Sequence, residues 1–283
     1  MTNGAVIFAL NNHDIDYIKL AVYSAKRVNK FLDLPVTLIT DKKDWFDKYY
    51  SDYKFDKIIE IQSDPYTKRN INDGAISSKL IDWKNTNRHK VFDLTPYDKT
   101  LVLDADYIVN SSILKTAFLV DQEFQIYKHS YDISGWRNSY EFTRINPYSV
   151  PFYWATCFVF EKSIFTQSFF HLVEYIKSNW EYFKILYNIN SKNHLFRNDH
   201  AFSMAINVMN GKTEGEFATN LPGKMYFCRD TDILIDIDDT KMTFLLQKEK
   251  HLGEYFVSQT SNLDVHVMNK MSLSRVLDGG SNV

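Results

Sequence analysis

The sequence predicts an α/β protein built around a mostly parallel β-sheet. Short apolar runs rich in β-branched residues recur in the first part of the chain, and they alternate with stretches that have the period of a helix. Strands that alternate with helices are joined by crossover connections, so they form parallel sheets. The expected strands are residues 5–10, 36–39, 57–61 and 100–103, and the expected helices are residues 18–28 and 76–83.

The chain opens with a β-α-β unit. The run from Ala5 to Leu10 is continuously apolar, as is typical of a strand buried on both faces of a sheet. Apolar residues then recur at helical spacing between Ile18 and Val28, and Asn12 or Asp14 can cap this helix. Pro35 can open the β-branched strand that follows it.

The second half of the chain mixes strands and helices. We expect strands at 124–128 and 156–160, a long helix from Ser163 to about Tyr187, a helix capped by Asn198 or Asp199 and ended by Asn210-Gly211, and short strands up to residue 268. We expect residues 1–275 to form one domain with halves 1–110 and 111–275, followed by a flexible tail at 276–283.

Composition and charge limit the classes of function. The net charge of the 283-residue chain is −2, and its Lys and Arg residues are spread along it, so an extended nucleic-acid-binding face has no support. The only cysteines, Cys157 and Cys228, lie far apart, so we expect free thiols in a reducing compartment. Because the sequence has no apolar run long enough to span a bilayer and no signal peptide, we expect a cytoplasmic protein.

The most informative motif is Asp104-Ala105-Asp106, at the end of the strand expected at 100–103. Residues two apart on a strand face the same side, so the two carboxylates can bind one hard cation together. In open α/β sheets, ligands bind beyond the carboxyl ends of the strands. Three more Asp-x-Asp pairs fit ordinary structural roles: Asp14 and Asp16 fit a helix start, Asp230 and Asp232 a loop, and Asp236 and Asp238 a half-exposed strand.

The motifs occur in an order that resembles a known family. Ser78-Lys79-Leu80, the run from Thr95 to Asp106, and the late run from Asp264 to Lys270 together resemble the nucleotide-diphospho-sugar transferases of the GT-A fold, especially the glycogenin-like glycosyltransferases of family 8 and their bacterial and viral relatives. The resemblance covers most of the chain. It implies a Rossmann-like mixed sheet flanked by helices, in which residues 1–110 bind the nucleotide and residues 111–275 bind the sugar and the acceptor.

The resemblance also implies a set of site residues. Asp104, Asp106 and His266 would hold a divalent metal, manganese or magnesium, although a histidine between two valines also fits an ordinary strand. Lys79, on the helix before the acidic strand, and Lys270 would meet the donor diphosphate; Lys270 comes two positions earlier than the family pattern, and Asn269 replaces a glycine. The remaining expected contacts are Ala9, Asn11, Tyr17 and Ala105 for the nucleotide, and Asp199 and Asp132 for the donor sugar, with a helix cap as the alternative role of Asp199.

The activity implied by the resemblance is the transfer of a sugar from a nucleotide-diphosphate donor, most simply a UDP-sugar, to a hydroxyl acceptor with retention of configuration. The acceptor stays open among a glycan, a protein, a small molecule and a modified nucleobase. A sugar nucleotidyltransferase is one alternative, but Leu10 to Asp16 lacks the glycine-rich phosphate loop of such enzymes. A catalytically silent protein that binds nucleotide-sugars, or a scaffold, is the other.

Overall fold

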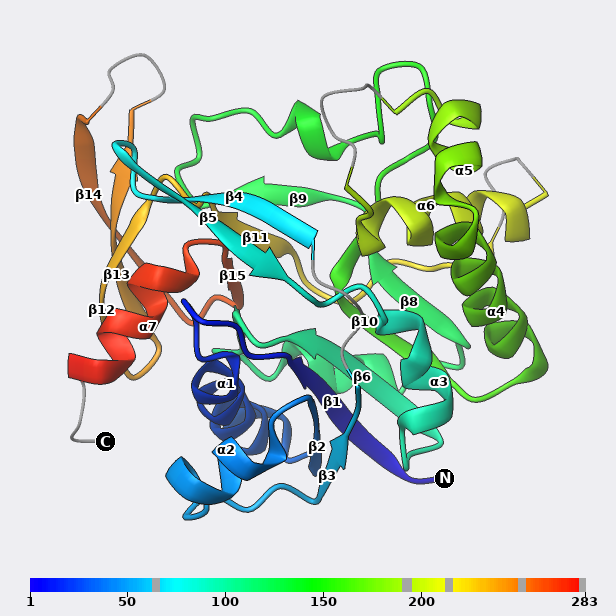
Figure 1. Cartoon of the computed structure of the whole chain (residues 1–283), viewed down its shortest axis with the longest axis horizontal. Coiled ribbons are helices and arrows are strands. Elements are labelled where there is room, and N and C mark those ends of the chain that lie inside the picture. Colours follow the sequence, from blue (N-terminus) through cyan, green and yellow to red (C-terminus); the bar gives the residue numbers. More distant parts are fainter. Residues whose placement is uncertain (63–66, 190–194, 212–215, 249–252, 280–283) are drawn as a thin grey trace.

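The computed structural model describes residues 1–62, 67–189, 195–211, 216–248 and 253–279, and a six-stranded sheet lies at its centre (Figure 1). The strand order is β3-β2-β1-β6-β10-β8; the first four strands are parallel, and β10 runs antiparallel to both of its neighbours. A mixed α/β sheet flanked by helices is therefore confirmed. The strands are β1 (Asn3–Ala9), β2 (Val36–Thr40), β3 (Lys57–Glu60), β6 (Lys99–Asp104), β8 (Phe124–Tyr127) and β10 (Trp154–Glu161).

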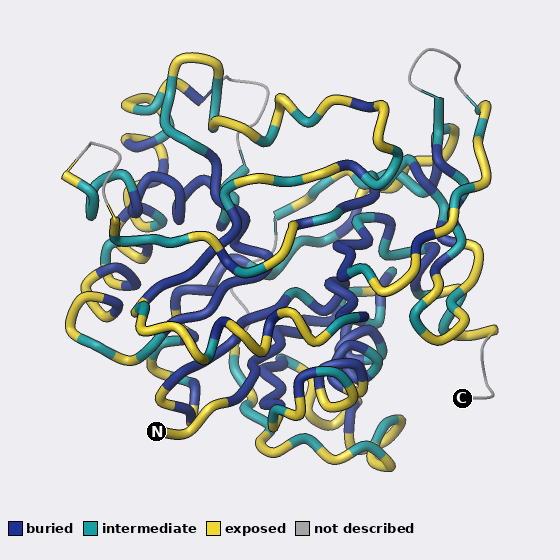
Figure 2. The backbone as a smooth tube through the Cα atoms, turned by 180° about the vertical axis from the view of Figure 1, so that it is seen from behind, coloured by how far each residue is buried: buried dark blue, intermediate teal, exposed yellow. Residues whose placement is uncertain are grey.

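Helices cover both faces of this sheet. Successive side chains of β1 point to opposite faces: Ala5 and Ile7 pack in one apolar cluster with α1, whereas Val6 and Phe8 pack in another with α4 and α6. Figure 2 shows the buried residues concentrated in the sheet and in the helix faces turned toward it. The helices are α1 (Tyr17–Leu32), α2 (Lys43–Tyr49), α3 (Val91–Leu94), α4 (Ile164–Ser178), α5 (Trp180–Leu186) and α6 (Asn198–Met209), with 3-10 turns η1 (Arg88–Lys90), η2 (Ile113–Phe118) and η3 (Tyr140–Phe142).

A second sheet, of order β7-β15-β11-β9, lies next to the carboxyl end of β6. β7 (Tyr107–Ile108) follows β6 after one tight turn and pairs with β15 (Val265–Val267), so that Tyr107 faces His266 in register. This pairing brings the late part of the chain to the end of the acidic strand. The other elements are β9 (Ser130–Asp132), β11 (Met225–Cys228), the antiparallel strands β12 (Ile233–Asp238), β13 (Lys241–Gln247) and β14 (Tyr255–Ser261), and helix α7 (Lys270–Gly279).

The helix expected at 76–83 is wrong: this segment is the second strand of a hairpin. β4 (Thr67–Asp73) and β5 (Ser77–Trp83) pair antiparallel, and Asp73 faces Ser77 across the turn. Gly74 has a φ of +80°, which is the left-handed conformation that hairpin turns require. Lys79 therefore lies on a strand of this hairpin and not on a helix.

Helix boundaries also differ from those expected. Asp16, and neither Asn12 nor Asp14, caps α1, because its carboxylate accepts the backbone N–H of Lys19 at 3.1 Å. The long helix after Ser163 breaks at Asn179 into α4 and α5.

The two later helices differ as well. The residue before α6 is Arg197, so Asn198 and Asp199 lie in its first turn and do not cap it. Helix α7 extends into the segment 276–283 that was expected to be a flexible tail, and residues 280–283 lie outside the described part. Within the described residues, no helix has both the length and the apolar character needed to cross a membrane.

Candidate functional site

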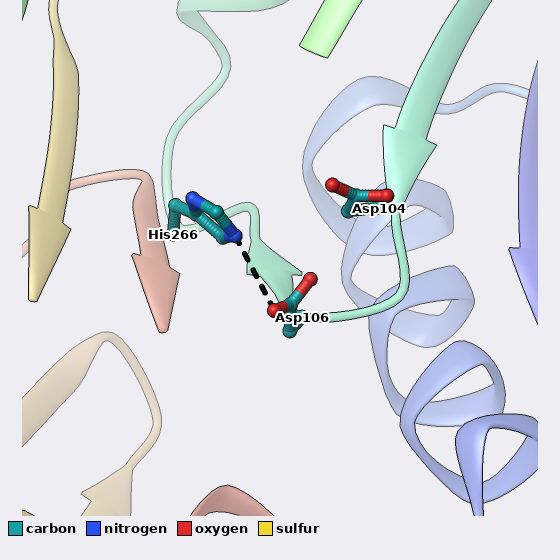
Figure 3. Close-up of side chains that lie close together, drawn as sticks. All are labelled: Asp104, Asp106 and His266. Atoms are coloured by element: carbon teal, nitrogen blue, oxygen red, sulfur yellow. Dashed lines mark ion pairs between the residues drawn. The ribbon is translucent and has the colours of Figure 1, made fainter. Parts of the chain in front are cut away.

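Asp104, Asp106 and His266 converge at the carboxyl edge of the parallel strands (Figure 3). Each offers one ligand atom, and these three atoms all lie within 4.8 Å of one another. His266 Nε2 is 3.3 Å from Asp106 Oδ2. Residues from the middle and the end of the chain thus form one cluster, as the resemblance implied.

A turn, and not strand alternation, brings the two carboxylates together. β6 ends at Asp104, and Ala105 and Asp106 form the turn into β7. Ala105 is buried within this turn. The backbone N–H of Val267 donates to the carbonyl oxygen of Asp106 at 2.9 Å, and this bond ties the turn to β15. His266 precedes that anchor directly, so its place relative to Asp106 is fixed by the backbone.

Two basic side chains neutralise the acidic pair. Lys270, the first residue of α7, places its Nζ 2.6 Å from Asp106 Oδ2. Arg88, in η1, pairs with Asp104 and also donates to the carbonyl oxygen of Ala155. Burial works to raise the pKa of Asp106, but Lys270 and His266 outweigh it and hold that pKa well below its usual range. Burial raises the pKa of Asp104 in spite of the opposing charge of Arg88.

The cluster fits a hard divalent cation by its chemistry. Two carboxylates and an imidazole are a donor set that manganese accepts, and magnesium is the harder alternative. His266 Nδ1 is buried and has no hydrogen-bond partner within the described residues, so no other group of the described protein occupies this nitrogen. The ammonium of Lys270 forms an ion pair with Asp106, so a cation that binds both aspartates has to displace this ammonium.

Asp199 shares a cleft with this cluster, whereas Asp132 does not. A cleft of about 60 Å³ is lined by Asp104, His266, Lys270 and Asp199 among others. The carboxylate of Asp199 accepts the backbone N–H of Ala155 at 3.0 Å and pairs with Arg197 at 3.0 Å. Burial works to raise the pKa of Asp199, but the charges of Arg197 and Arg88, together with His200, outweigh it and lower that pKa.

Asp132 lies at the end of β9 with only 1% of its side chain exposed. It forms ion pairs with Arg137 at 2.8 Å and with Arg229 at 3.2 Å. These contacts favour a role in holding the two arginines.

The residues expected to bind the nucleotide surround the end of β1. Ala9 is the last residue of that strand and is fully buried. Asn11 is engaged within the protein: its side-chain oxygen accepts the backbone N–H of Ile18 at 3.0 Å, and its amide donates to Asp16 at 2.9 Å. The buried hydroxyl of Tyr17 has no hydrogen-bond partner in the described chain. Burial, followed by the negative charge of Asp106, raises the pKa of this hydroxyl.

The sequence did not reveal the basic residue that contacts the acidic strand. Lys79 pairs with Asp14 and is 55% exposed on its side chain, while Arg88 pairs with Asp104. Arg69 and Arg197 at the cleft wall were missed as well. Their positions depend on the hairpin and on the start of α6, and no local motif marks an isolated arginine.

Comparisons with known proteins find a likeness in structure only. No protein-family model matches the chain, and a search of curated proteins finds no match. Among solved structures, the glycosyltransferase GlyE of Streptococcus pneumoniae TIGR4 is 14% identical with a TM-score of 0.42; the match covers 78% of this chain and 45% of that one. The apo-form of GlyE is 16% identical with a TM-score of 0.41, covering 77% and 45% of the two chains. The chain thus spans less than half the length of these proteins, and a likeness of this extent assigns no activity.

Proposed function

We propose that this protein is a metal-dependent glycosyltransferase that moves a sugar from a nucleotide-diphosphate donor, with UDP as the nucleotide, to a hydroxyl acceptor. One observation carries the proposal: the ligand atoms of Asp104, Asp106 and His266 lie within 4.8 Å of one another at the carboxyl edge of parallel strands. Ligands of open α/β sheets bind at such an edge. The order of motifs that resembles family 8 supports it further.

In this proposal the acidic cluster holds the cation, and basic groups hold the donor. Asp104, Asp106 and His266 would bind manganese or magnesium, which when bound stabilises negative charge on the leaving diphosphate. Lys270, once released from Asp106, donates to diphosphate oxygens as a compact charge. The hydroxyl of Tyr17 has no partner in the described chain, and it would donate to a nucleotide bound over the end of β1 at Ala9.

Lys79 lies further from the proposed chemistry. Its exposed ammonium pairs with Asp14, and Arg88 is the basic group in contact with Asp104. We therefore assign the role of holding the donor phosphates to Arg88 and Lys270 ahead of Lys79.

The transfer step requires no strong side-chain base. In a retaining reaction the bond from the sugar carbon to the diphosphate oxygen breaks, and a bond from that carbon to the acceptor oxygen forms on the same face. The acceptor proton passes to the departing diphosphate oxygen. Asp199 stays ionised at neutral pH because Arg197 pairs with it, so it stabilises positive charge on the sugar and does not act as an acid.

One observation favours the silent binder as a second candidate. The ammonium of Lys270 already neutralises Asp106, and Arg88 neutralises Asp104, so the two carboxylates are satisfied without a metal. A protein that binds a nucleotide-sugar without cleaving it could retain this arrangement. Turnover separates the two candidates.

A donor screen tests the proposal. The purified protein is incubated with manganese and with UDP-, GDP- and CMP-sugars, and release of the nucleotide is measured with and without a chelator. We expect slow release from a UDP-sugar that stops when the metal is removed. Binding of UDP by calorimetry without release from any donor would establish the silent binder instead.

A further inference from the structure

A large cavity adjoins the cleft that contains the acidic cluster. It has a volume of about 910 Å³, which is within the range of cavities that hold small-molecule ligands. The cavity and the cleft share Arg69, Arg197 and Met268 as a common wall. Asp104 and His266 line the cleft and are not among the described residues that line the large cavity. The cavity therefore lies beside the proposed metal site, across this wall.

The lining of the cavity is basic. Of its described lining residues, five are arginines and two carry carboxylates. His200 adds no charge, because burial and then the charge of Arg197 lower its pKa to about 3. The arginines are Arg69, Arg137, Arg144, Arg197 and Arg229, and the acidic residues are Glu141 and Asp230.

Carboxylates behind the lining hold part of this basic surface rigid. Asp232, fully buried, forms two parallel hydrogen bonds with Arg137, each 2.7 Å long. It also accepts the backbone N–H groups of Arg229 and Gln247, each at 2.9 Å. Asp132 pairs with Arg137 and Arg229 from the other side. Because these guanidinium groups are ordered before a ligand arrives, binding would cost little side-chain entropy.

Two arginines of the lining lack a direct carboxylate partner among the described residues. Neither Arg69 nor Arg144 forms an ion pair with a carboxylate in the part of the chain that the structure describes; Arg69 packs over the ring of Trp83 at 5.1 Å, and Arg144 donates to the carbonyl oxygen of Ser149 at 2.7 Å. Burial, followed by the neighbouring positive charge of Arg197, lowers the pKa of Arg69 by more than the charges of Asp199 and Asp230 raise it.

The hydrogen bonds of the Asp230 carboxylate go to Asn72, whose backbone and side-chain N–H groups it accepts at 3.0 and 3.1 Å, although its charge still acts on Arg69. Guanidinium groups bind carboxylate and phosphate through paired hydrogen bonds. The half-buried guanidinium of Arg69 and the exposed one of Arg144 have no direct ion pair among the described residues, so both can take such a group.

The geometry points to an acceptor that carries an oxyanion, a phosphate or a carboxylate, bound by Arg69 and Arg144 in the large cavity while its hydroxyl reaches across the shared wall to the donor sugar. This inference rests on the proposed glycosyl transfer and names the class of its acceptor. Tyr140, which also lines the cavity and is 78% exposed, offers a flat apolar surface for a sugar ring. The acceptor is thus a hydroxylated, anionic compound, and sugar phosphates are small probes of this class.

A binding experiment that needs no turnover tests this site. Glucose, galactose, their 6-phosphates and glucuronate are titrated into the full protein by calorimetry, without donor. We expect the anionic compounds to bind at least about tenfold more tightly than the neutral sugars. Arg69→Met and Arg144→Met should each remove most of that preference. Lys26→Met, which removes an exposed positive charge on α1, is the matched control and should keep it.

Three results would overturn the inference. The first is equal affinity for charged and neutral sugars, and the second is tighter binding of a short single-stranded oligonucleotide than of any sugar phosphate. The third is a loss of UDP affinity in Arg69→Met with no change toward sugar phosphates, which would assign Arg69 to the donor. If sugar phosphates bind through Arg69 but no donor is cleaved, the oxyanion site stands and the proposed transferase activity fails.

Discussion

Replacing Lys270 with methionine should tighten the binding of manganese. The ammonium lies 2.6 Å from Asp106 Oδ2, so a cation has to break this ion pair before it can bind both aspartates. A contact between charged groups of this kind contributes about 1.5–3 kcal/mol, which corresponds to about a tenfold to a hundredfold change in affinity. Methionine keeps the length and packing of the stem while removing the charge.

Calorimetric titration of manganese into the nucleotide-free protein measures this effect. Lys84→Met is the matched control: Lys84 pairs with Asp41 at 2.9 Å, and 18% of its side chain is exposed against 14% for Lys270. Only Lys270→Met should tighten binding. Unchanged affinity, or equal tightening in both variants, would refute the claim that Lys270 competes with the metal at Asp106.

Three further predictions concern stability and are measured by urea denaturation. Burial raises the pKa of Asp264 from 3.8 to about 6, so the folded state holds a proton on this carboxyl at pH values where the unfolded state has lost it. The free energy of unfolding should therefore fall by up to about 3 kcal/mol between pH 4 and pH 7, relative to Asp264→Asn. The same pH dependence in both proteins would contradict this. Gly4→Ala should lower the free energy of unfolding by about 1–3 kcal/mol, because the added Cβ would lie 2.4 Å from the Tyr97 ring, whose hydroxyl is held by two hydrogen bonds. A variant of unchanged stability would show that the ring moves aside without cost. Arg88→Met should cost about 3–5 kcal/mol, because it removes the direct ion pair of the partly buried Asp104, and added manganese should recover part of the loss. A variant as stable as the natural protein would contradict the pairing.

The sequence predicted the parallel core because strong local patterns and tertiary packing agree there. β1, β2 and β6 are rich in apolar and β-branched residues and are buried along almost their whole length, so composition identifies them. The hairpin at 67–83 was missed because Ile76 and Leu80 have helical spacing. Both side chains are largely exposed, so this spacing does not reflect a buried helix face. The dipeptide Asp73-Gly74 is typical of a hairpin turn, and Gly74 has the positive φ that such a turn uses.

Helix α7 was also missed, although its capping signal is local. Asn269 was treated as a replacement for a glycine of the family pattern. Its side-chain oxygen accepts the backbone N–H of Ser272 at 2.9 Å, and its amide donates to the carbonyl oxygen of Asp232 at 2.7 Å. Asn269 therefore caps the helix that begins with Lys270 and joins it to Asp232, behind the lining of the large cavity. The first of these bonds follows a known capping spacing, but the second depends on tertiary structure.

Some residues of the candidate site were predicted from the sequence, and others were not. Asp104, Asp106 and His266 were selected from the sequence because a motif order related them, and the structure brings their ligand atoms together. Arg69 and Arg88 were not selected, since a single arginine has no local pattern that separates a site residue from a surface one. Their roles depend on which chain segments fold over the carboxyl edge of the sheet, and residue spacing does not encode that.

The most direct test of the account compares two Asp-x-Asp pairs of the same chain. Asp106→Asn and Asp236→Asn remove the same charge, but Asp106 is buried in the acidic cluster while Asp236 is exposed on β12. Manganese-dependent release of UDP from the donor identified by the screen is measured for both variants, with folding checked by circular dichroism. Asp106→Asn should lose this activity, and Asp236→Asn should retain it. Near-normal metal-dependent turnover in folded Asp106→Asn would contradict the central claim.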